Sequence, residues 1–154
     1  MGTGYRGTPA EVRALNTYLK LLRAAGSTSA RLNGLLADAG VTECQFAVLE
    51  ALYHLGAMHQ CQLAEKVQRT GGNITLVVDN LEKRGLVRRR REAADRRFIT
   101  VHLTPAGQRL VKQTLPRHVA NIVAQLSVLT AAEQDELGRL CRKLGLMSFD
   151  DQVR

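Results

Sequence analysis

Long apolar runs are absent from this 154-residue sequence. None approaches the roughly 18 residues of a membrane-spanning helix. The first thirteen residues also lack the apolar core of a secretory signal peptide. We therefore expect a cytoplasmic protein with no membrane partner. Its length suits one domain, or one module with flanking helices.

Motifs for covalent or metal chemistry are also missing. The cysteines, Cys44, Cys61 and Cys141, are odd in number and widely spaced, which fits neither a disulfide framework nor a zinc-ligand pattern. The histidines form no metal-spaced cluster, and the sequence has no nucleophile elbow and no phosphate-binding loop. These absences predict a protein that is not an enzyme and that holds neither a metal nor a cofactor.

Positive charge is the first strong feature that is present. Lysine and arginine number 22 against 14 acidic residues, a formal net charge of +8. The excess is spread along the chain, but its local density is highest from Arg84 to Arg97, where seven arginines face only Glu92 and Asp95. Such a density favours a polyanionic partner, because each neutralised phosphate releases condensed counterions.

Four threonines mark expected helix starts. Three of them begin a capping box, in which a Glu or Gln three residues later returns the hydrogen bond, and Thr104 precedes Pro105 at the first helical position. The capping boxes are Thr8 with Glu11, Thr42 with Gln45, and Thr130 with Glu133. The expected helices run from Thr8 toward Leu36, from Thr42 to Gly56, over Gln62–Val67 and Gly72–Arg84, from Pro105 through Leu126, and from Thr130 to Gly145.

The segment Gly72–Arg84 has the pattern of an amphipathic helix. Its apolar positions, Ile74, Val77, Val78 and Leu81, fall on one stripe. Short polar residues and glycines gather at its start, where a DNA-recognition helix needs side chains that reach base edges. The alternative is an ordinary surface helix with a solvated polar face.

A basic hairpin follows this helix. Alternating residues predict a strand over Phe98–Leu103, paired with Val87–Arg91 across the turn Glu92–Arg96. Consecutive arginines are often a solvated charge run, but a wing that lies along phosphates is stabilised by them. Arg97 is placed to enter a narrow minor groove, with Asp95 holding it extended. The alternative for these two residues is a weak surface ion pair.

Together these segments resemble the multiple antibiotic resistance regulator (MarR) family of bacterial transcription factors. The family's wing signature stands here as Asp95-Arg96-Arg97, five residues, then Leu103-Thr104-Pro105-Ala106-Gly107. Leu63–Lys66 and the segments Gly72–Thr75 and Val78–Val87 look like the family's two helix-turn-helix helices.

The resemblance implies a mainly α fold with a small β-wing (α+β), a winged helix-turn-helix in a homodimer that binds double-stranded DNA at a palindromic operator. Residues 41–104 would form the DNA-binding lobe, and residues 1–40 and 105–154 the helical dimerisation region. Many members carry arginine where this sequence has Leu76 and Asn80, which affects base reading rather than binding mode. The expected DNA-contacting residues are Thr70, Gly72, Asn73, Thr75, Leu76, Asn80, Lys83, Arg88, Arg89, Arg90, Arg91, Asp95, Arg96 and Arg97.

Members of this family commonly release DNA when a small aromatic or phenolic ligand binds, or when a cysteine is oxidised. Candidate ligand-lining residues are Arg23, Tyr53, His54, Met58 and His118, with a structural role as the alternative for each. Part of the recognition segment is similar to the quinone-responsive branch of the family.

Cys44 lies near a helix N-terminus, where a thiol pKa can fall; a buried apolar role is the alternative. The sequence thus predicts a repressor released by an aromatic, phenolic or quinone-like effector. A thiol-based redox-sensing repressor and a sequence-tolerant architectural DNA-binding protein remain the alternatives.

Overall fold

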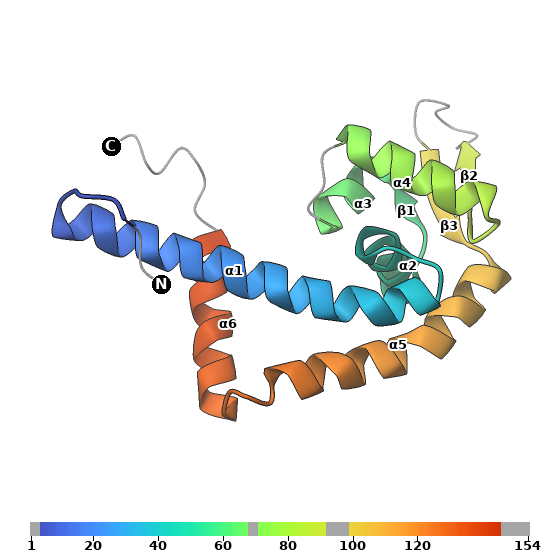
Figure 1. Cartoon of the computed structure of the whole chain (residues 1–154). Coiled ribbons are helices and arrows are strands. Elements are labelled where there is room, and N and C mark those ends of the chain that lie inside the picture. The colour runs from blue at the N-terminus through green and yellow to red at the C-terminus, as the bar shows by residue number, and fades with distance from the viewer. Residues whose placement is uncertain (1–3, 68–70, 92–98, 146–154) are drawn as a thin grey trace. The chain divides into compact units, whose positions relative to one another are not determined.

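The computed structural model describes residues 4–67, 71–91 and 99–145 and divides the chain into two compact units, Met1–His118 and Val119–Arg154. The elements of the first unit run from the long helix α1 (Pro9–Asp38) through a small sheet to most of α5 (Pro105–Leu126; Figure 1). The fold is mainly α with a three-stranded antiparallel sheet, which confirms the predicted class.

The first two helices begin at the predicted threonines. The helix α1 (Pro9–Asp38) is capped by Thr8, whose hydroxyl accepts from the Glu11 amide while the Glu11 carboxylate accepts from the Thr8 amide at 2.8 Å. The hydrogen bonds that the Thr8 amide and the Thr8 hydroxyl donate to this carboxylate lower the pKa of Glu11. The helix α2 (Glu43–Leu55) has the same box at Thr42 and ends at Gly56.

The next two helices, α3 and α4, also occur where the sequence pattern predicts them. The helix α3 (Gln60–Lys66) begins two residues earlier than expected, and α4 (Gly71–Lys83) is followed by Gly85. Gly85 adopts a φ of 69°, a left-handed conformation that glycine takes without steric cost. The predicted apolar stripe of α4 is buried in full: Ile74, Val77, Val78 and Leu81.

The sheet has the order β1-β3-β2. The strands β2 (Val87–Arg91) and β3 (Ile99–Leu103) form the predicted hairpin, with Arg89 opposite Val101. The strand β1 (Met58–His59) pairs with the other side of β3 and was not predicted, because two residues are too few to show a period. Phe98 and the turn Glu92–Arg96 lie outside the described residues.

One core holds the winged part of the first unit together. It draws on α1 through Leu36, on α2 through Phe46 and Leu49, on β3 through Val101 and on α5 through Val111. The end of α1 and the start of α5 therefore belong to the same packed unit as the helix-turn-helix. The assignment of residues 1–40 and 105–154 to a dimerisation region remains a prediction.

The Leu103–Gly107 segment connects the sheet to α5 (Pro105–Leu126) and packs closely against the backbone at Gly85 and Leu86. The Thr104 amide donates to the Leu86 carbonyl at 3.1 Å, and the Thr104 hydroxyl donates to the Gly85 carbonyl at 2.7 Å. That hydroxyl also accepts from the Gly107 amide at 3.1 Å, which caps α5. A Cβ on Gly107 would overlap the Leu86 carbonyl oxygen and lie 2.7 Å from Leu103 Cδ1.

The second unit consists of the end of α5 and the helix α6 (Ala131–Gly145). Thr130 forms the predicted capping box with Glu133. The hydrogen bonds that the Thr130 amide and hydroxyl donate to the carboxylate lower the pKa of Glu133. No residue of α6 is buried, and Leu137, Leu140 and Leu144 are 43%, 47% and 58% exposed. None of the helices within the described ranges is both long enough and apolar enough to cross a membrane.

Candidate nucleic-acid interface

The outer face of α4 carries the predicted base-reading side chains. With Ile74 and Val78 anchored in the core, the helix turns Asn73, Thr75 and Leu76 outward. Leu76 is 60% exposed. An exposed methyl-bearing side chain near a helix N-terminus can contact the C5-methyl group of thymine. Lys83 is also exposed, whereas Asn80 is half-buried.

Pairing with β3 gives β2 two distinct faces. Val87 is buried and Arg89 is half-buried on one face, while Arg88 and Arg90 are exposed on the other. Arg91, at the end of the strand, is exposed as well. Three of the four arginines are thus exposed, and their contacts with phosphates remain a prediction.

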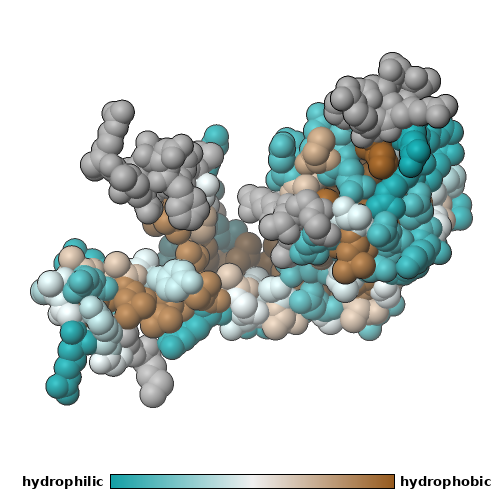
Figure 2. Space-filling view, turned by 90° about the horizontal axis from the view of Figure 1, so that it is seen from above, coloured by the Kyte–Doolittle hydropathy of each residue, from teal (hydrophilic) through white to brown (hydrophobic). Residues whose placement is uncertain are grey.

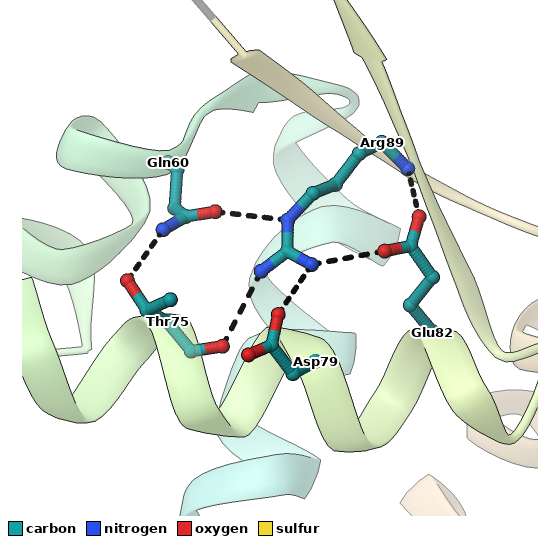
Figure 3. A network of polar contacts seen from close by, with 5 residues as sticks. All are labelled: Gln60, Thr75, Asp79, Glu82 and Arg89. Atoms are coloured by element: carbon teal, nitrogen blue, oxygen red, sulfur yellow. Dashed lines mark hydrogen bonds and ion pairs between the residues drawn. The ribbon is translucent and has the colours of Figure 1, made fainter.

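Arg89 departs from the sequence-based expectation. We predicted that it would lie along DNA phosphates, but its guanidinium is directed back onto α3 and α4 (Figure 3). The cause is the two-residue period of the strand, which places Arg89 on the same face as the buried Val87. The geometry therefore favours contacts of Arg89 within the protein over a direct contact between its guanidinium and DNA phosphates.

His102 lies opposite Arg88 on the exposed side of the hairpin. Partial burial, followed by the nearby Arg90 and Arg88 guanidinium groups, lowers the pKa of His102 below its usual range. This shift favours the neutral form of the imidazole.

Four of the predicted DNA-contacting residues come from the segments 68–70 and 92–98. Thr70, Asp95, Arg96 and Arg97 lie outside the described residues, and Gly72 falls in the first turn of α4. Their contacts with DNA remain predictions. The segment that carries Arg97 joins β2 to β3, and both of these strands belong to the described residues.

The five predicted effector-lining residues come from four elements, α1, α2, β1 and α5. Tyr53 and His54 stack edge to face at 5.1 Å on α2, and Met58 lies in β1 against the core. His118 packs edge-on against Phe46 at 5.1 Å, and its buried Nδ1 has no hydrogen-bond partner among the described residues. Arg23 is exposed on α1. Their roles in effector binding remain predictions.

A hollow of about 430 Å³ lies instead between the end of α1 and the first half of α5. Apolar side chains, two guanidinium groups and the Asp38 carboxylate line it. The lining residues are Leu35, Asp38, Ala39, Leu86, Ala106, Arg109, Leu110, Gln113, Thr114 and Arg117. Sequence reasoning missed this set, because its members are ordinary amphipathic-helix residues until α1 and α5 are brought together.

Cys44 is half-buried in the first turn of α2, packed against the core, whereas Cys61 and Cys141 are exposed. A redox role for Cys44 therefore remains a prediction, and its contacts are those of an apolar core residue. Within residues 4–67, 71–91 and 99–145, no cluster of His, Cys, Asp or Glu could hold a metal ion.

These features define a winged-helix DNA-binding module, and comparison with known proteins gives its family. Residues 41–99 match the family model described as the MarR family. The chain is 33% identical to the HTH-type transcriptional regulator MhqR of Bacillus subtilis over 134 residues, which cover 87% of this chain and 92% of that protein. The chain belongs to the MarR family and is a DNA-binding transcriptional regulator, not an enzyme.

Solved structures agree with this assignment. The MarR family regulator Sco3205 of Streptomyces coelicolor, solved in complex with DNA, superposes with a TM-score of 0.83 at 26% identity, covering 95% of this chain and 94% of that chain. BpsR of Bordetella bronchiseptica, whose DNA binding is regulated by 6-hydroxynicotinic acid, gives a TM-score of 0.78 at 28% identity, covering 84% and 98%.

Proposed function

We propose that this protein is a homodimeric repressor that binds a palindromic operator through α4 and the arginines of the β2–β3 wing. The observation that carries the proposal is the arrangement within one packed unit of an outward polar face on α4 and an outward arginine face on β2. The first face can read base edges in a major groove, and the second can hold phosphates at its side.

Apolar surface supports the dimer. Leu137, Leu140 and Leu144 recur on one side of α6 and are exposed, and Leu22 of α1 is 50% exposed. Figure 2 shows hydrophobic side chains gathered over the first half of α1, at the left of the view. Such stripes favour association in water. A two-fold symmetric dimer presents two equal reading helices, which a palindromic site matches.

Selection of bound duplexes from random DNA tests this function. We expect one enriched palindrome, bound by two chains, with an affinity at least about a thousandfold above that for random DNA at physiological salt. Recovery of unselected sequence at equal affinity would instead identify an architectural DNA-binding protein, the alternative class.

We further propose that a small aromatic or phenolic effector releases the operator by binding the hollow between α1 and α5. The guanidinium groups of Arg109 and Arg117 suit a carboxylate or phenolate, and Leu35 and Leu110 suit its ring. The regulation of BpsR by 6-hydroxynicotinic acid is a precedent in a protein of similar fold. Binding here would favour a spacing of the two reading helices that the operator does not accept.

A variant with Cys44, Cys61 and Cys141 replaced by serine separates this model from thiol sensing. We expect it to bind the operator and to release it with the same phenolic or quinone-like compounds as the parent. If it binds the operator but no longer responds to any of them, the redox alternative is correct and the hollow is not the sensor.

A further inference from the structure

The Arg89 side chain of β2 is bonded to two other elements, α3 and α4. Its Nη1 lies 2.6 Å from Asp79 Oδ1 and 2.9 Å from Glu82 Oε2, both on α4. Its Nε donates to Gln60 Oε1 of α3 at 3.1 Å, and its Nη2 donates to the Thr75 carbonyl at 3.3 Å. All three guanidinium nitrogens are therefore used within the protein (Figure 3).

The backbone of Arg89 takes part in the same link. Since β2 is at the edge of the sheet, the Arg89 amide is turned away from β3 and donates to Glu82 Oε1 at 2.7 Å. Glu82 thus accepts from both the main chain and the side chain of one wing residue. These two hydrogen bonds fix the position of β2 along the axis of α4.

Gln60 extends the link to a base-reading side chain. Its amide oxygen accepts from Arg89, and its amide nitrogen donates to the Thr75 hydroxyl at 2.9 Å. Wing strand, helix α3 and the outer face of α4 are therefore connected by side-chain hydrogen bonds through two residues, Arg89 and Gln60 (Figure 3).

Burial and charge give the link its strength. The Arg89 side chain is 19% exposed, whereas Asp79 and Glu82 are 41% and 38% exposed. A planar guanidinium can serve partners in several directions at once, which a lysine ammonium on a flexible stem does not reproduce. Without the Arg89 guanidinium, Asp79 and Glu82 would lose this positive partner on the helix that approaches DNA phosphates, and the two carboxylates would repel the phosphates.

We propose that Arg89 is a positioning residue of the DNA-reading unit, which fixes the wing to the recognition helix and neutralises Asp79 and Glu82. It supports operator recognition without itself contacting phosphate. The proposal rests on the proposed function and deepens it, because it assigns how the two DNA-contacting parts keep their mutual geometry. Arg90, one residue away on the opposite face, is assigned the phosphate contact.

A matched pair of variants, Arg89→Gln and Arg90→Gln, tests the assignment because each removes one charge from the same strand. We expect Arg89→Gln to weaken operator binding about ten- to hundredfold, more than random DNA binding, with the slope of log affinity against log salt unchanged. Arg90→Gln should weaken both DNAs alike and flatten that slope by about one unit. A flattened slope in Arg89→Gln would overturn the proposal. So would full operator affinity in Arg89→Lys, which keeps the charge but not the geometry.

For Glu82→Ala, a positioning role and a simple charge effect predict opposite changes in operator binding. Removing a negative charge beside DNA should tighten binding if charge alone matters, and the exposed Glu65→Ala of α3 is the control for that effect. We expect Glu82→Ala to lower the ratio of operator to random affinity about tenfold, and Glu65→Ala to leave it unchanged. An unchanged ratio in Glu82→Ala contradicts the positioning role.

Hydrogen exchange of the free protein provides a readout that needs no DNA. We expect the Arg89 amide to exchange at least about tenfold faster in Glu82→Ala than in the parent or in Glu65→Ala. Equal rates in all three proteins would overturn the link. Because this measurement does not depend on an operator, its failure is distinguishable from a failure of the proposed function, which would show as no sequence preference in the parent.

Discussion

Replacing Leu137 and Leu140 with glutamate is expected to convert the proposed dimer into a folded monomer. Both leucines are exposed on α6, so the change removes apolar surface without opening a cavity. Burial of a leucine side chain stabilises by about 1.5–3 kcal/mol, and four such side chains are lost per dimer. The dimer should therefore weaken by about 6 kcal/mol or more, and sedimentation at low micromolar concentration should detect monomer.

Operator affinity should fall with the dimer. A monomer reads one half-site and loses the effective concentration of its second reading helix, a factor on the order of a hundred to ten thousand. The double variant Arg142→Gln with Lys143→Gln is the control, because it makes the same change in net charge on the same helix. A dimer that survives the leucine replacements would place the interface elsewhere.

The second large effect is expected from a single added methyl group. In Gly107→Ala the new Cβ meets the Leu86 carbonyl oxygen, a backbone atom that also accepts from the Thr104 amide. Relief of that overlap has to shift the junction between the hairpin and α5. We expect the free energy of unfolding to fall by about 2–4 kcal/mol, which corresponds to a fall in melting temperature of roughly 5–15 °C.

Gly26→Ala is the matched control. Gly26 also lies in a helix, and a Cβ there would have no heavy atom within 4 Å. Since alanine is a better helix former than glycine, the free energy of unfolding of this variant should rise by up to about 1 kcal/mol. If both variants melt like the parent, the close approach at Gly107 does not constrain the fold.

Local signals account for most of the fold that could be predicted. The threonine capping boxes gave the starts of α1, α2 and α6, because a cap is a contact between residues three apart. The stripe of α4 gave its buried side for a similar reason. Contacts between distant segments could not be predicted this way: the strand β1 exists only because β3 pairs with it.

The candidate site shows the same limit at one residue. The run Arg88–Arg91 was interpreted as uniform, although the apolar Val87 already indicated which alternate arginine would face inward. Asp79 and Glu82, spaced three apart on α4, were the matching signal, but their partner became evident only with the strand docked beside the helix. Gln60 carried no sequence signal, since its role depends on the packing of α3 against α4.

The most direct test of the central claim, that the outer face of α4 reads base sequence, is a binding profile over every single base substitution of the selected half-site. The parent should be compared with Asn73→Ala, Leu76→Ala and Arg90→Gln. The account predicts that each α4 variant loses about 1–3 kcal/mol of discrimination at one or two base pairs and keeps the rest, while Arg90→Gln lowers the whole profile evenly. An unchanged profile in both α4 variants would contradict it.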